Sequence, residues 1–148
     1  MATLLKIFLA SHGHLASGMK SSLEILMGPT HNLTVFDAYT QGNDESVSNK
    51  LDQFYKEVKP DDTVLLCSDL YGGSVNNEMY RYLDRPNTKL VAGINLAFLL
   101  EVLNESADRL TDDRLKEIIA NSRKFLMRVD CVPSSNGSSV NNLTEDFF

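Results

Sequence analysis

The sequence of 148 residues has few of the residues from which disulfide frameworks and zinc sites are built. Its two cysteines, Cys67 and Cys131, form neither a C-x-x-C pair nor a spacing typical of zinc ligands. The opening apolar run, residues 4–10, is too short to span a membrane and has no signal-peptide cleavage pattern. We therefore expect a cytoplasmic protein that folds without disulfide or metal staples.

Basic residues are also too few to attract a polyanion. Lys and Arg number 14 against 20 Asp and Glu, which gives a formal net charge of −6. No basic stripe offsets this field, so we expect neither nucleic acid nor an anionic membrane surface as a partner. The sequence also lacks the nucleotide-binding P-loop, the G-x-G-x-x-G fingerprint, the G-x-S-x-G elbow and the H-E-x-x-H zinc motif.

Short apolar runs alternate with longer amphipathic stretches. Strands are predicted over residues 4–10, 33–37, 63–68 and 88–94. Between and after them we expect helices: one that ends at Gly28-Pro29, one capped by Asn43 or Asp44, one from Ser74 to about Asp84, one opened by Asn95 and one capped by Thr111. This order predicts an α/β fold with an open, mainly parallel four-stranded sheet and helices on both faces.

The pattern fails near the C-terminus. A short strand is possible over residues 128–132, and the polar stretch 133–148 lacks periodicity. We therefore expect one domain over residues 1–132, followed by a flexible polar tail over residues 133–148.

Polar side chains collect where the predicted strands end. The first four strands end in His12, Asp37, Asp69 and Asn95. Ligands of open parallel sheets bind outside the carboxyl ends of the strands. Asp37 and Asn95 either line a pocket at this edge or only terminate their strands.

His12 and Asp69 form the first candidate constellation at this edge. A neutral imidazole at a strand end can be a nucleophile, a general base or a metal ligand, or it can be a loop histidine without a role. A carboxylate that accepts one ring N–H would fix the tautomer and leave the other nitrogen free. Asp69 can play this part, or it can cap the turn that follows it.

Glycines beside this pair indicate a possible anion site. Gly72-Gly73-Ser74 enters a predicted helix, where glycines permit close backbone approach and N–H groups carry partial positive charge. A plain helix cap behind a glycine-rich turn would have the same sequence. Together with Gly13, which follows His12, these residues are the expected phosphate-binding group of a site for phosphoryl chemistry on histidine. A metal site built on His12, His14 and Asp69 is the alternative, although the spacing of the ligands is loose.

Four segments resemble the IIA component of the mannose-family phosphotransferase system. They are Ala10-Ser11-His12-Gly13, Leu23-Glu24-Ile25-Leu26-Met27-Gly28, Asp69-Leu70-Tyr71-Gly72-Gly73-Ser74-Val75-Asn76-Asn77 and Val91-Ala92-Gly93-Ile94-Asn95-Leu96. The resemblance is collinear over about residues 4–127. The sequence departs from the family pattern at Val75 and at Leu96, where a proline is frequent, and this puts loop stiffness and partner choice in question.

The resemblance implies that His12 accepts a phosphoryl group from the phosphohistidine of HPr and passes it to a IIB component. Membrane IIC and IID components would then take part only indirectly. By the same resemblance Asp69 holds the His12 ring, Ser74 helps to bind the phosphoryl group, and no cofactor or metal is implied. A homodimer is also implied, in which residues 128–132 would add as a strand to the partner's sheet.

Two other functions would use the same pocket. One is a regulatory binding module that reports the phosphorylation state of a carrier, and the other is a phosphocarrier of the dihydroxyacetone-kinase type.

Overall fold

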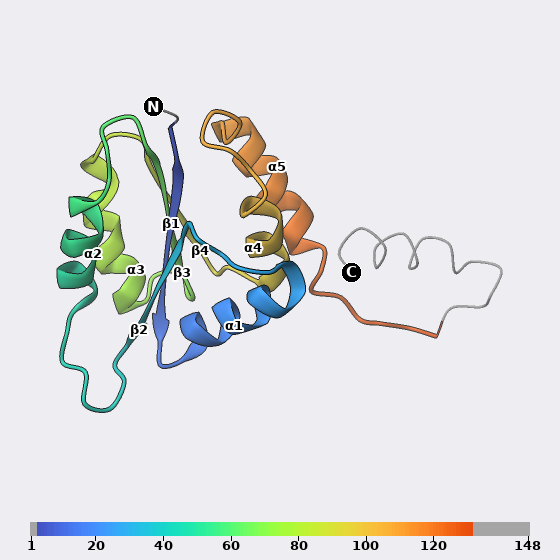
Figure 1. Cartoon of the computed structure of the whole chain (residues 1–148). Coiled ribbons are helices and arrows are strands. Elements are labelled where there is room, and N and C mark those ends of the chain that lie inside the picture. Colours follow the sequence, from blue (N-terminus) through green and yellow to red (C-terminus); the bar gives the residue numbers. More distant parts are fainter. Residues whose placement is uncertain (1–2, 132–148) are drawn as a thin grey trace.

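The computed structural model describes residues 3–131. Four parallel strands form one sheet in the order β2-β1-β3-β4 (Figure 1). Their bounds are β1 (Leu5–His12), β2 (Leu33–Ala38), β3 (Thr63–Ser68) and β4 (Thr88–Ala92). The predicted fold class is confirmed.

Helices cover both faces of this sheet (Figure 1). On one face lie α2 (Val47–Lys56) and α3 (Ser74–Tyr80), the latter continued by the 3-10 helix η1 (Arg81–Asp84). On the other face lie α1 (Leu15–Met27), α4 (Leu96–Val102) and α5 (Asp112–Arg123). None of the helices in residues 3–131 is long and apolar enough to cross a membrane.

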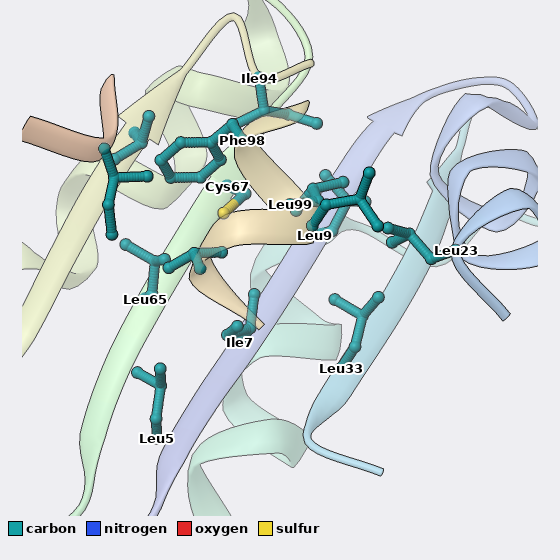
Figure 2. Close-up of a cluster of buried hydrophobic side chains, with 14 of the residues drawn as sticks. Leu5, Ile7, Leu9, Leu23, Leu33, Leu65, Cys67, Ile94, Phe98 and Leu99 are labelled. Atoms are coloured by element: carbon teal, nitrogen blue, oxygen red, sulfur yellow. The ribbon is translucent and has the colours of Figure 1, made fainter. Parts of the chain in front are cut away.

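The strands are apolar on both sides because each side of the sheet packs against helices. Successive residues of a strand point to opposite faces. In β1, Ile7 and Leu9 therefore join the cluster beneath α1, α4 and α5, whereas Phe8 and Ala10 join the cluster beneath α2 and α3. Figure 2 shows the first cluster, in which Phe98 and Leu99 of α4 face side chains from β1, β2 and β3.

The predicted helix caps match the structure at two helices and differ at a third. The side chains of Asn95 and Thr111 accept N–H groups at the starts of α4 and α5, as predicted. The prediction for α2 was wrong, because Ser46 is its cap. The Asn43 side chain instead accepts the N–H of Glu45 at 3.1 Å within the loop that precedes the helix.

Three element boundaries also differ from the prediction. The third helix changes to 3-10 geometry at Arg81, and Pro86 restrains the residue before it from helical conformation. β4 ends at Ala92 because Gly93 turns to a left-handed φ of 71°. β1 continues to His12, which pairs with Ala38 of β2.

The segment after α5 forms no strand over residues 128–131 (Figure 1). In this single chain it runs away from the sheet and cannot pair with it. Val132 and the predicted tail 133–148 lie outside the described residues, so strand exchange with a second copy stays a prediction.

Asp62 joins the starts of β1 and β3. Its side chain is 2% exposed, and its carboxylate accepts the N–H groups of Leu4 at 3.1 Å and Lys59 at 2.9 Å. Burial alone would raise the pKa of this carboxyl, but the two backbone hydrogen bonds and the charges of Lys6 and Lys59 lower it below the ordinary 3.8.

We expect Asp62→Ala to lower the free energy of unfolding by about 1–3 kcal/mol at pH 7, because two backbone donors lose their acceptor. A carboxyl whose pKa is lowered by folding stabilises the protein above its unfolded pKa. The difference in free energy of unfolding between wild type and variant should therefore have its largest value above about pH 4. It should shrink as the pH falls through the lower pKa of the folded state. Denaturant titrations at pH 7 and pH 3 measure it. Asp61→Ala, at an exposed neighbour, is the control, and equal losses in both variants would contradict the assignment.

Candidate functional site

The candidate site lies where β1 and β3 end side by side in the middle of the sheet. The chain leaves β1 into α1 on one face and leaves β3 toward α3 on the other (Figure 1). Divergence of this kind opens a crevice at the carboxyl edge of a parallel sheet. His12 is the last residue of β1, and Asp69 directly follows β3, so the topology places the two side chains together.

One carboxylate oxygen of Asp69 contacts both the backbone and the ring of His12. Oδ2 accepts the backbone N–H of His12 at 2.9 Å and lies 2.8 Å from its ring Nδ1. A carboxylate can only accept, so the proton of a neutral ring stays on Nδ1 and the lone pair is on Nε2. Sequence reasoning left open whether Asp69 orients His12 or caps a turn, and the structure shows the contact with His12.

Asp69 is ionised near neutral pH. Burial alone would raise the pKa of this carboxyl, but the backbone and ring N–H groups of His12, together with the charge of the ring when protonated, lower it below 3.8. Its fixed negative charge therefore lies beside Nδ1 of His12.

The second ring nitrogen points to the start of α3. Ser74 Oγ lies 3.4 Å from Nε2, which is long for a hydrogen bond. The turn before it needs its glycines for two different reasons. Gly72 has a left-handed φ of 75°, and a Cβ on Gly73 would lie 3.3 Å from Cε1 of His12.

The backbone of Gly13 links two strand ends. Its N–H donates to the carbonyl of Ala38 at 2.7 Å and so ties the end of β1 to the end of β2. That N–H is engaged within the sheet, and a part for Gly13 in phosphate binding stays a prediction.

Tyr39 belongs to the site, and sequence reasoning missed it. Its hydroxyl donates to Ser74 Oγ at 2.8 Å, and its ring centroid lies 5.5 Å from that of His12. Its φ of 61° is left-handed, which costs a bulky residue on the order of 1–3 kcal/mol. The only signal in the sequence was its place, two residues after Asp37 at a strand end.

Asp37 and His14 form a separate pair beside the site. His14 Nδ1 lies 3.0 Å from Asp37 Oδ2, and the same carboxylate accepts the N–H of Ser17 at 3.0 Å. Burial alone would raise the pKa of Asp37, but these contacts lower it below 3.8. Asp37 therefore holds the start of α1 as well as ending β2.

The three ligands of the predicted metal alternative do not gather. His14 turns to Asp37 instead of Asp69. Within residues 3–131, no group of three or more His, Cys, Asp or Glu is placed to hold a metal ion. Asn95 lies outside the His12 cluster as well, since its side chain caps α4 and donates to the carbonyl of Ser122 at 2.8 Å.

Comparison with known proteins places this arrangement in a family. The family model of EIIA-man, described as the fructose IIA component of the phosphotransferase system, matches residues 6–119. The chain belongs to this family. As a IIA component, it is a phosphotransferase component of a sugar transport system.

This IIA chain is similar to curated and solved relatives. It is 24% identical over 122 residues to the fructose-specific EIIA component of Bacillus subtilis, a match that covers 82% of this chain and 84% of that one. It is 27% identical over 110 residues to the mannose-specific EIIAB component of Escherichia coli, which covers 74% of this chain and 34% of that protein. A crystal structure of a IIA protein associated with the fucose utilization operon of Streptococcus pneumoniae has a TM-score of 0.74 and 26% identity, and covers 86% of this chain and 96% of that one.

We expect Gly73→Ala in this IIA chain to move the imidazole of His12. The φ of Gly73 is −74°, which alanine adopts without strain. The tightest contact of the new Cβ is Cε1 of His12 at 3.3 Å, whereas two atoms of Leu70 lie at the ordinary contact distances of 3.6 and 3.8 Å. The NMR signals of the His12 ring should shift, and those of His31 should stay. Gly18→Ala is the control, since nothing lies within 4 Å of its added Cβ. His12 signals that match those of wild type would show that the ring does not depend on this glycine.

Proposed function

We propose that the chain is a phosphocarrier, which accepts a phosphoryl group from the phosphohistidine of HPr on Nε2 of His12 and passes it to a histidine of a IIB component. One observation carries the proposal. Asp69 occupies Nδ1 of His12, and the remaining nitrogen faces the hydroxyl of Ser74 and the glycine turn before it.

The transfer needs no general acid between two histidines. As the N–P bond of the donor breaks, the lone pair of Nε2 forms the new N–P bond, and the donor imidazole leaves as a neutral group. His12 keeps its proton on Nδ1 and gains positive charge. Asp69, ionised and only 10% exposed, stabilises that charge, and the same steps run in reverse order toward IIB.

Donors for the phosphoryl oxygens come from the start of α3. The first N–H groups of a helix lack partners within the helix, and here they belong to Ser74 and Val75. The Ser74 hydroxyl adds a further donor beside Nε2. Because Val75 stands where the family often has proline, its N–H is an additional donor.

The surroundings of His12 fit a macromolecular donor and acceptor. The His12 side chain is 42% exposed, as access by a second phosphohistidine requires. Leu15, Leu70 and Tyr71, in the segments that follow β1 and β3, are 48%, 60% and 84% exposed. Apolar side chains around a reactive centre favour contact with a protein surface, which we assign to HPr and to IIB in turn, with IIC and IID reached only through IIB.

Phosphorylation with phosphoenolpyruvate, enzyme I and HPr tests the proposal. Mass spectrometry at neutral to alkaline pH should map acid-labile phosphate to His12, and that phosphate should move to a cognate IIB protein. His12→Ala should abolish labelling. His14→Ala, the matched control, should keep most of it, because His14 pairs with Asp37. A folded wild-type protein that takes no label from cognate phospho-HPr would refute the proposal.

Asp69→Ala should slow phosphorylation of His12 by about 10- to 100-fold and leave the fold intact, because the residue orients the ring at the edge of the sheet without filling the core. Asp69→Asn separates orientation from charge, since its amide oxygen can still accept from Nδ1. Rapid-quench measurement of phosphohistidine gives the phosphorylation rates of both variants, and circular dichroism tests their folding. Wild-type rates in a folded Asp69→Ala protein would remove this residue from the mechanism.

A further inference from the structure

The Tyr39 side chain is held in a way that packing does not explain. It is 62% exposed, so it contributes little to the core, yet its backbone has the left-handed φ of 61°. A left-handed φ strains the backbone of a bulky residue, and strain of this kind gathers at functional sites.

The strained backbone brings the Tyr39 hydroxyl to Ser74. Ala38, the preceding residue, is fixed by its pairing with His12 and by the N–H of Gly13. From that anchored strand end the tyrosine reaches across the ends of β1 and β3 to α3, where its hydroxyl donates to Ser74 Oγ at 2.8 Å. Its ring lies at 33° to the imidazole, with 5.5 Å between the centroids.

This hydrogen bond decides where the Ser74 proton points. A serine hydroxyl can rotate freely and donates only one hydrogen. Once Oγ accepts from Tyr39, its own hydrogen is directed away from the tyrosine and toward another acceptor. Nε2 of His12, at 3.4 Å, is that acceptor in this structure. A phosphoryl oxygen bound at Nε2 would take its place.

We propose that Tyr39 is a positioning residue for phosphoryl transfer, which orients the Ser74 hydroxyl toward the phosphoryl group on His12. This inference rests on the proposed function, because it needs Nε2 of His12 to carry the phosphoryl group. Two hydroxyls in a chain also polarise each other, so Ser74 becomes a stronger donor than it would be alone. Tyr39 acts through Ser74 and leaves the nucleophile itself unchanged.

A double-mutant cycle tests whether Tyr39 acts through Ser74. The rate of phosphoryl transfer from phospho-HPr to His12 and the half-life of the phosphohistidine are measured in wild type, Tyr39→Phe, Ser74→Ala and the double variant. Tyr39→Phe keeps the aromatic ring and removes only the hydroxyl. At saturating phospho-HPr this variant should transfer roughly 5- to 10-fold more slowly, which corresponds to the loss of one hydrogen bond. Its KM should change little. The double variant should be no slower than Ser74→Ala.

Tyr80→Phe is the matched control. Tyr80 is 67% exposed at the C-terminal end of α3, away from His12, and its hydroxyl makes no hydrogen bond to another of the residues 3–131. Its variant should transfer at the wild-type rate. Circular dichroism tests whether every variant is folded.

The outcomes separate the two proposals. Labelled wild type with a slower Tyr39→Phe, and no added loss in the double variant, supports the positioning role. Labelled wild type with an unchanged Tyr39→Phe, or losses that multiply in the double variant, overturns that role and leaves the phosphocarrier intact. Wild type without label overturns both.

Discussion

The geometry of the site depends on one carboxylate oxygen. Oδ2 of Asp69 accepts the backbone N–H and faces the ring Nδ1 of the same residue, His12. The first contact joins the end of β1 to the segment after β3. The second holds the imidazole ring against the same oxygen. The ring is thus oriented by the same atom that joins the two strands. The free nitrogen then has one direction, toward the start of α3.

This oxygen is in place because the sheet order makes β1 and β3 neighbours. Ala10 and Ser68 are paired in register, so the chain positions that follow them meet at the same edge. The two strands continue to opposite faces, α1 on one side and α3 on the other, and the edge between them is left open. His12 at 42% exposure is therefore both fixed and accessible.

Strand and helix order, and the place of His12 and Asp69 at one edge of the sheet, could be predicted from the sequence because they follow from apolar periodicity and from the rule for parallel sheets. The contact between the two side chains could not, because Asp69 could equally have capped the turn that follows it. Features set by competition between polar partners could not. Asn43 has the chemistry of a cap, yet its side chain bonds within the loop and leaves that role to Ser46. The role of Tyr39 could not be predicted either, because no local sequence pattern indicates a hydrogen bond to a residue 35 positions away.

The contrast between the two histidines supports His12 as the residue that carries the phosphoryl group in the proposed function. His12 and His14 both present Nδ1 to a carboxylate, so that arrangement alone does not distinguish them. Their free nitrogens differ. Nε2 of His12 lies beside Ser74, and a Cβ at Gly73 would lie 3.3 Å from Cε1 of the same ring. His14 is 80% exposed, and its Nε2 makes no hydrogen bond to another of the residues 3–131. The carboxylate provides orientation and charge, which both pairs have. Under the proposed function the turn before α3 provides the donors for the phosphoryl group, and of these two histidines only His12 lies beside that turn.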